Sequence, residues 1–216
     1  MKEGKFYILN WAFSYGSASS NRLLAYANSA VEYGYKVEII ALLRLELKNC
    51  KPRKGIVIRG LRPCRLESRF LSKILSFFTT IWFLLTVVKK EDRLLLYGSA
   101  EYLPFFVWFR CRQTFFEVTE CPDLFKPKTY PWKYYKRLWR RLNGIFVISS
   151  NLKQYFVDYG VNPQRVHVIN MIVDPKRFDG VMHNDKVEKY VAYCGNVNKD
   201  SKDGVGDLIA SFVRYH

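Results

Sequence analysis

The sequence predicts an open α/β fold, a Rossmann-like parallel sheet with helices on both faces. Short apolar runs alternate along the chain with stretches that have the period of an amphipathic helix. Strands that are apolar throughout are typical of a parallel sheet buried on both sides. The composition, 49% hydrophobic, 17% aromatic and 25% charged in 216 residues, is that of a globular protein with room for one large domain, or one domain and a fragment.

The elements follow one another in order. Residues 5–10 are an apolar first strand, too short and too aromatic for a signal peptide. A helix over 20–33, with its apolar residues on one face, ends at Gly34 and leads into a strand over 35–42. A third strand is predicted over 55–59. A long apolar helix over 70–89 then precedes a strand over 93–97.

The alternation continues to residue 170. We predict helices over 101–110, 132–142 and 151–159, and strands over 113–118, 144–149 and 165–170. Residues 172–189 are polar and loop-like, and Tyr190 opens a further strand. We therefore expect a Rossmann-like domain over 1–171, a linker over 172–189 and the start of an incomplete second domain over 190–216.

The charge is strongly positive. The chain has 35 Lys and Arg against 19 Asp and Glu, a net charge of +16. Such a surface should attract nucleic acid, an acidic membrane or a phosphorylated small molecule. Five scattered cysteines without a C-x-x-C pair indicate reduced thiols in a cytosol and no zinc site. Neither a phosphate-binding P-loop nor a G-x-S-x-G nucleophile motif is present.

Residues 74–88 are the candidate membrane segment, because they contain no charge and are flanked by lysines. A spanning helix needs about 20 apolar residues, so this one is short. Three interpretations stay open: a buried helix packed on the sheet, a helix partly buried in a membrane interface, and a true span.

Three loops or segments could carry chemistry. Gly16 and Ser17 precede a helix, so their backbone could bind an anion, or Ser17 could simply cap the helix. Glu117 and Glu120 lie at the carboxyl end of the strand FFEV and could orient or deprotonate a sugar hydroxyl. Alternatively, these two glutamates could cap a helix or form ion pairs with the basic segment downstream.

That basic segment, residues 126–141, has seven Lys and Arg, five aromatic residues and no acid. It could bind anionic lipid headgroups, grip RNA, or be a solvated helix face with aromatic side chains in the core. RNA is the least favoured of the three in an α/β fold. The candidate membrane-binding residues are Lys133, Lys136, Arg137, Arg140, Arg141, Trp132 and Trp139.

Several stretches, in order along the whole chain, resemble retaining glycosyltransferases of family 4, which have the GT-B fold. They are EYGYKVEII, GIFVISSNLKQYFVDYGV, RVHVINMIVDPKRF and YCGNVNKDSKDGVGDLIASF. The third is similar to the family's V-I-x-N-G-V-D-x-x-x-F motif, with Asn170, Asp174 and Phe178 matching and Met171 in place of Gly.

The resemblance implies transfer of a sugar from a nucleotide sugar to a polysaccharide or lipid-linked acceptor in cell-surface glycan synthesis, without a metal or other cofactor. It places the acceptor in the first domain and the donor in the second, with Gly195, Asn196 and Lys202 near the donor; Asn196 replaces the family's Arg. Glu117 or Glu120 would stand in for an acceptor-side His. The protein would work in the cytoplasm, peripherally on the inner face of the plasma membrane.

The family's pair of glutamates would lie beyond His216, so we expect this chain to be truncated and inactive on its own. The alternative is a non-catalytic domain that docks on a membrane or on a partner chain. A nucleic-acid-binding domain, the third possibility, would show steeply salt-dependent retention on RNA or DNA.

Overall fold

The computed structural model describes residues 4–48, 50–61, 69–98, 100–108, 113–125, 131–170, 210, 211, 213 and 214. The chain divides into two units, Met1–Asp174 and Pro175–His216. In the second unit only the four residues from 210 onward are described, and they are helical. The predicted linker over 172–189 and the further strand at Tyr190 lie outside the described residues.

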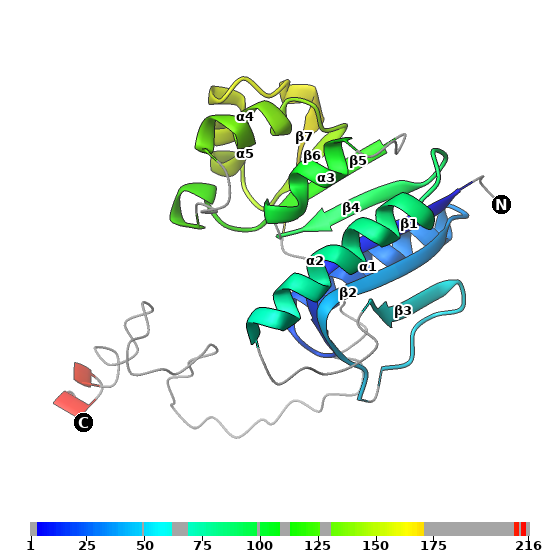
Figure 1. Cartoon of the computed structure of the whole chain (residues 1–216). Coiled ribbons are helices and arrows are strands. Elements are labelled where there is room, and N and C mark those ends of the chain that lie inside the picture. Colours follow the sequence, from blue (N-terminus) through cyan, green and yellow to red (C-terminus); the bar gives the residue numbers. More distant parts are fainter. Residues whose placement is uncertain are drawn as a thin grey trace. The chain divides into compact units, whose positions relative to one another are not determined.

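The first unit contains a seven-stranded sheet in which all pairings are parallel, which confirms the predicted fold class (Figure 1). The spatial order is β3-β2-β1-β4-β5-β6-β7. The strands are β1 (Lys5–Ser14), β2 (Lys36–Glu46), β3 (Ile56–Gly60), β4 (Arg93–Tyr97), β5 (Gln113–Val118), β6 (Gly144–Val147) and β7 (Val166–Val168). The chain first winds outward from β1 to β3, then returns beside β1 and winds the other way. The switch point therefore lies between β1 and β4, where open α/β sheets commonly bind ligands.

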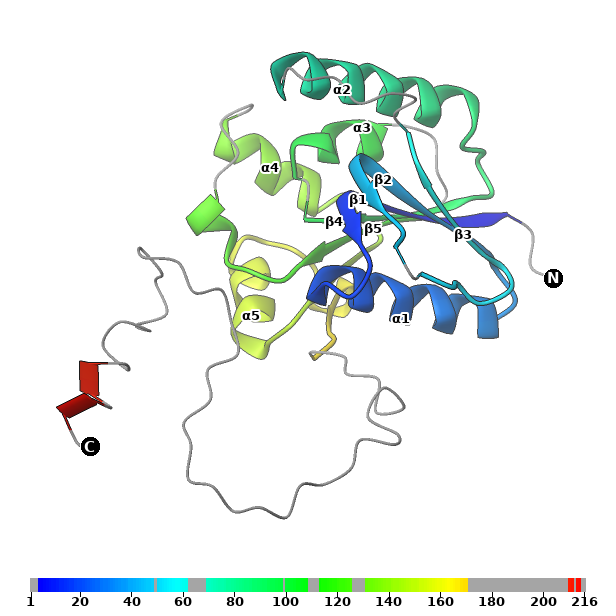
Figure 2. The same cartoon turned by 90° about the horizontal axis from the view of Figure 1, so that it is seen from below.

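The described residues of the first unit form five α-helices, which connect or cover the strands. They are α1 (Ala18–Glu32), α2 (Arg69–Thr86), α3 (Leu103–Trp108), α4 (Trp132–Trp139) and α5 (Ser150–Asp158). Three short 3-10 helices lie between these elements. They are η1 (Ala100–Tyr102) before α3, η2 (Pro122–Phe125) between β5 and α4, and η3 (Pro163–Arg165) before β7. Figure 2 shows α1 on one face of the sheet and α2, α3 and α4 on the other.

Two apolar layers form the core. On the α1 face, Leu23 and Ala27 pack against Ile8, Ile39 and Leu95, all fully buried. A larger cluster fills the opposite face and contains side chains of α2, α3, α4 and α5, including Phe83, Phe106, Tyr135, Trp139 and Phe156. Because side chains on a strand alternate between faces, apolar residues at successive positions supply both layers.

Two strands are longer than the sequence predicts. β1 continues past Asn10 to Ser14, and β2 continues past Leu42 to Glu46, with a register shift between Asn10 and Ala12. The extension ends in polar contacts, because the Ser14 hydroxyl donates a hydrogen bond of 2.8 Å to Glu46 Oε2. β1 runs through the polar Asn10 into Trp11 and Phe13, and β2 runs through the charged Arg44, so hydropathy alone places the strand ends too early. The last predicted strand is shorter than expected, since β7 ends at Val168.

The long apolar helix α2 buries only one of its faces. Ser76 and Thr80 are fully buried, and the Ser76 hydroxyl donates a 2.9 Å hydrogen bond to the carbonyl of Leu42 in β2. The opposite face exposes large apolar side chains, among them Phe78 and Trp82. No helix of the described ranges is both long and apolar enough to cross a bilayer. One face of the helix packs on the sheet, as in the first of the three interpretations that the sequence left open, and the other face is exposed.

Candidate functional site

A pocket opens at the carboxyl edge of the sheet, where β4 and β5 end. Its volume is about 280 Å³. Its floor and walls are made by Gly98 and Ala100 after β4, by Phe116 of β5, by Pro122, and by Tyr135 and Trp139 of α4. Parallel strands bring all their carboxyl ends to this edge, so loops that are distant in sequence meet there. The pocket is thus mainly aromatic and apolar.

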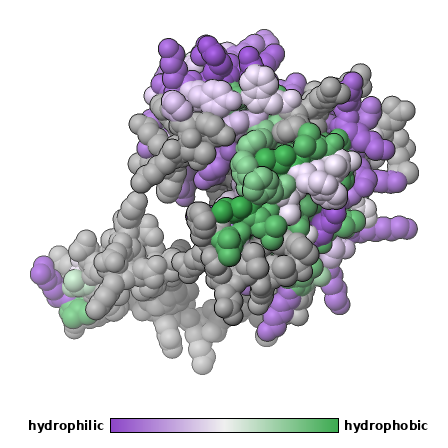
Figure 3. Space-filling view, in the orientation of Figure 1, coloured by the Kyte–Doolittle hydropathy of each residue, from purple (hydrophilic) through white to green (hydrophobic). Residues whose placement is uncertain are grey.

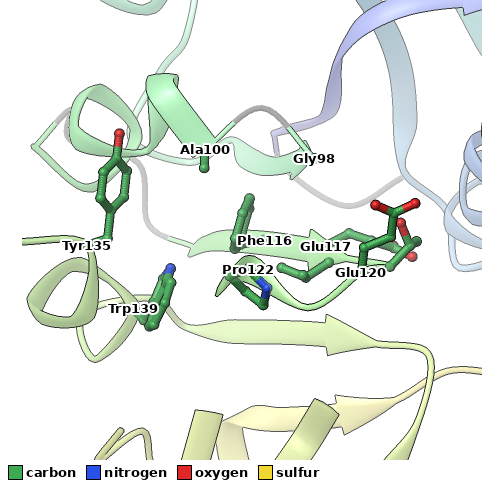
Figure 4. A pocket seen from close by; sticks show the side chains of 10 residues that line it. Gly98, Ala100, Phe116, Glu117, Glu120, Pro122, Tyr135 and Trp139 are labelled. Atoms are coloured by element: carbon green, nitrogen blue, oxygen red, sulfur yellow. The ribbon is translucent and has the colours of Figure 1, made fainter. Parts of the chain in front are cut away.

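Glu117, near the carboxyl end of the strand FFEV, and Glu120, in the loop that follows, also line this pocket. Figure 4 shows the two side chains close together at one end of the pocket, with Tyr135 and Trp139 toward the other end. They differ in environment: Glu117 is 1% exposed, whereas Glu120 is exposed in the loop. The structure therefore brings both predicted carboxylates to one site but leaves only Glu120 open to solvent.

Glu117 is held by a buried ion pair with Arg22 of α1. The Arg22 Nε donates to Glu117 Oε1, and the exposed fractions of the two side chains are 3% and 0%. The two other guanidinium nitrogens donate to backbone carbonyls just after β7, with 2.8 Å to Asn170 and 2.7 Å to Ile169. Arg22 thereby joins the first helix, the fifth strand and the chain segment that leaves the sheet.

The charge state of Glu117 reflects two opposing effects. Burial raises the pKa of the Glu117 carboxyl, while the nearby Tyr26 hydroxyl and the Arg22 guanidinium lower it. Within the described part of the chain, Glu117 Oε2 and the Tyr26 hydroxyl are buried without a hydrogen bond of normal geometry, although they are close enough to interact electrostatically. Burial and the charge of Glu117 in turn raise the pKa of Tyr26. Arg22 therefore engages one oxygen of Glu117, and the Tyr26 hydroxyl is a second polar neighbour of the carboxyl group.

Gly16 and Ser17 form the turn between β1 and α1. Gly16 has a φ of 90°, a conformation that favours glycine. The Ser17 hydroxyl accepts a hydrogen bond of 3.2 Å from the Ser20 amide and donates one of 2.9 Å to the Ser20 hydroxyl. Ser17 is thus the N-cap of α1, which was the alternative to anion binding. Anion binding by this turn stays a prediction.

The predicted donor-side residues Gly195, Asn196 and Lys202 lie outside the described residues. No group of three or more His, Cys, Asp or Glu side chains that could hold a metal ion occurs among the residues the structure describes.

The basic segment forms α4 and the turn that follows it. Lys133, Arg137, Arg140 and Arg141 are exposed, and the Lys136 ammonium lies over the Tyr159 ring, 3.8 Å from its centroid. The side chain of Trp132 lies outside the described residues.

Trp139 departs from the prediction that it faces a membrane. It is 2% exposed and meets Phe156 of α5 edge to face, with ring centroids 4.9 Å apart. Its ring belongs to the core and to the pocket wall, because α4 turns this side toward the sheet.

Sequence reasoning missed Arg22 altogether. Its position in the amphipathic pattern of the first helix is typical of a solvent-facing cation, and its acidic partner lies 95 residues further along the chain. Only the unmatched Glu in the otherwise apolar strand FFEV signals that a buried cation is needed.

The sequence of most of the chain matches one protein-family model. The family model Glycosyltransferase Family 4 matches residues 20–177. No curated protein matches the chain in sequence.

Solved structures share the fold at low sequence identity. The Anabaena protein HepE, crystallised in complex with UDP and glucose, is 12% identical with a TM-score of 0.55, over 82% of this chain and 46% of HepE. The lipopolysaccharide outer core galactosyltransferase WaaB, in its apo form, is 14% identical with a TM-score of 0.54, over 97% of this chain and 57% of WaaB. This chain spans about half the length of these proteins.

Proposed function

The chain belongs to Glycosyltransferase Family 4, and from this premise we propose that it takes part in transfer of a glycosyl group from a nucleotide sugar to a glycan or lipid-linked acceptor in cell-surface glycan synthesis. The observation that carries the proposal is the pocket at the carboxyl edge of β4 and β5, in the part of the chain that the family match covers. HepE, whose structure holds UDP and glucose, supports a uridine diphosphate sugar as the first donor to test.

The pocket suits a sugar acceptor chemically. Tyr135, Trp139 and Phe116 provide an apolar, aromatic wall for the carbon face of a pyranose ring, and Glu120 provides an exposed carboxylate that accepts a hydrogen bond from a sugar hydroxyl. In the proposed reaction the acceptor oxygen forms a bond to the anomeric carbon of the donor, the bond from that carbon to the diphosphate breaks, and the hydroxyl proton is released.

We assign different roles to the two carboxylates. Glu120 is the candidate that touches the acceptor hydroxyl, because it is exposed at the mouth of the pocket. Glu117 is a positioning residue, because Arg22 holds one of its oxygens and it lies beneath the surface. The predicted donor contacts Gly195, Asn196 and Lys202 remain part of the proposal.

A transfer assay tests this function. The whole chain is incubated with UDP-glucose or UDP-galactose and with soluble glycans or short-chain lipid-diphosphate oligosaccharides, and products are followed by mass spectrometry. Binding of each acceptor alone is followed by the change in tryptophan fluorescence. We expect acceptor binding to weaken about tenfold or more in Glu120→Gln, a typical cost for losing one charge-assisted hydrogen bond.

Glu101→Gln is the matched control, since Glu101 is an exposed acid in η1 and does not line the pocket. It should bind acceptor as the unchanged chain does. Equal loss in both variants would refute the role of Glu120. If no acceptor binds and no hexose is transferred from either donor, the proposed function is wrong.

A further inference from the structure

The helix α2 presents an exposed apolar stripe on the side away from the sheet. Four large side chains form it: Ile74 is 38% exposed, Phe78 and Trp82 are each 62% exposed, and Leu85 is 60% exposed. Their spacing of four, four and three residues places them on one face of the helix. Figure 3 shows the corresponding band of hydrophobic surface along the position of α2 in Figure 1. A continuous exposed apolar patch of this kind marks a surface that meets another apolar phase.

The opposite face of α2 is fixed to the domain. Phe83 and Leu84 are buried in the core, Phe83 meets Tyr7 of β1 edge to face at 5.3 Å, and Ser76 is hydrogen-bonded to the backbone of β2. The stripe cannot turn inward without breaking these contacts. It is therefore a permanent feature of the folded surface.

The surroundings of the stripe are positively charged. The segments α2, α3 and α4 contain no Asp or Glu. Exposed lysines lie within α2 at Lys73 and a few residues after it at Lys89 and Lys90, which are followed by the exposed Glu91. The exposed Arg137 of α4 and the exposed Arg141 just after α4 belong to the same side of the sheet, where Figure 2 shows α2, α3 and α4.

An amphipathic pair on α3 and α4 adds to this face. Trp108 is 63% exposed, its indole N–H donates a 3.1 Å hydrogen bond to the Tyr134 hydroxyl, and the Arg141 guanidinium lies 5.3 Å from its ring centroid. Trp beside Arg is a combination that suits the boundary between acyl chains and headgroups, because the ring is apolar and its N–H and the guanidinium stay hydrated.

We propose that the α2–α3–α4 face docks on an anionic lipid bilayer, with the Ile74–Phe78–Trp82–Leu85 stripe lying in the interface and the lysines and arginines on lipid phosphates. The absence of acidic residues from α2, α3 and α4, in a chain of net charge +16, carries the choice of an anionic surface. The exposed apolar side chains of the stripe favour a lipid bilayer over nucleic acid, because nucleic acid has no apolar interior into which they could insert. The helix lies along the bilayer rather than across it.

Vesicle binding tests the proposal without donor or acceptor, so its outcome is independent of glycosyl transfer. The whole chain is mixed with vesicles of phosphatidylcholine and phosphatidylglycerol, or of phosphatidylcholine alone, and pelleted. We expect binding to the anionic vesicles only. The double variant Phe78→Ser/Trp82→Ser should bind these vesicles at least about tenfold more weakly, because it loses the apolar area that two aromatic rings bury in the bilayer.

Tyr33→Ser is the matched control, because Tyr33 is an exposed aromatic residue at the end of α1 on the opposite face of the sheet. It should bind vesicles as the unchanged chain does. A second measurement uses vesicles with brominated lipid, which quench tryptophans in the interface. Trp82→Phe should keep binding yet lose a large part of the quenching.

Three results would overturn the proposal. They are absence of binding to anionic vesicles, unchanged binding by the Phe78→Ser/Trp82→Ser variant, and quenching that is the same with and without Trp82. Self-association of the chain in ultracentrifugation that disappears in the double variant, without vesicle binding, would assign the stripe to a second copy instead.

Discussion

The buried pair of Arg22 and Glu117 permits the sharpest prediction, the effect of Arg22→Met. This substitution keeps an apolar stem of similar length but removes the guanidinium from Glu117 and from the carbonyls of Ile169 and Asn170. Glu117 stays 1% exposed and loses its compensating charge. Breaking a buried ion pair on one side costs about 3–5 kcal/mol, most of which is the penalty of the remaining unpaired charge.

The chain offers a matched control in the pair of Arg44 and Glu46. These side chains are also joined by an ion pair, but their exposed fractions are 70% and 36%. Exposed pairs contribute about 0–1 kcal/mol, because water screens the charges. Arg44→Met should therefore change the free energy of unfolding several times less than Arg22→Met. Urea titration followed by circular dichroism measures both, with the midpoint compared at constant slope.

The pH dependence of the loss gives a second signature. Without Arg22, burial raises the pKa of Glu117 with less opposition, so the folded variant binds a proton more tightly than the unfolded chain. Stability from a carboxyl with a raised folded pKa is present below its unfolded pKa and is lost as pH rises through the folded pKa. The difference between Arg22→Met and the unchanged chain should thus shrink from about pH 7 to about pH 5.

The double variant Arg22→Met/Glu117→Gln tests whether the unpaired charge causes the loss of stability. Replacing the carboxylate with an amide removes the unpaired charge, so a large part of the lost stability should return. The reasoning is refuted if Arg22→Met costs no more than Arg44→Met, or if its cost is independent of pH and unchanged by Glu117→Gln.

Two further predictions concern local packing. Gly144→Ala should lower the free energy of unfolding by about 1–3 kcal/mol, because its Cβ would lie 2.8 Å from a ring carbon of Phe115, which stacks on Phe146. Gly60→Ala is its control on another strand, with nearest atoms at 3.6 Å, and should be close to neutral in the same urea titration; equal losses would contradict the steric argument. Ser149→Ala should cost about 1 kcal/mol, since the hydroxyl caps α5 by accepting a 3.2 Å hydrogen bond from the Leu152 amide, and no change in the urea midpoint would show that the cap contributes nothing.

The sequence predicts the sheet well because the pattern is local. Strands that are apolar on both sides and alternate with amphipathic helices bury both faces of the sheet when they form a parallel α/β fold. The carboxyl edge then follows from the topology, so Glu117 and Glu120 could be placed at that edge from the sequence, whereas the pocket that they share was found only in the structure. Strand ends were harder, because the polar Asn10 inside β1 and the charged Arg44 and Glu46 in β2 interrupt the apolar pattern.

The orientation of uniformly apolar or aromatic segments could not be predicted. α2 has apolar residues on all sides, so its hydropathy does not tell which side meets the sheet and which side exposes Phe78 and Trp82. In α4 the aromatic residues alternate with cations, and only packing against α5 decides that Trp139 is buried while Arg137 is exposed. Which face of each of these helices is buried depends on the shape of the neighbouring strands and helices against which it packs.

By itself the sequence determined the fold class, the resemblance to family 4 glycosyltransferases, the basic character of the surface and the two carboxylates at the strand end. Each of these depends on composition, period or order along the chain. Tertiary structure alone decided that Arg22 neutralises Glu117, that Glu120 is the carboxylate open to solvent, and that one face of α2 stays exposed. The physical reason is that burial and ion pairing depend on distances in space between residues far apart in sequence, and a buried charge is stable only where the fold supplies its partner.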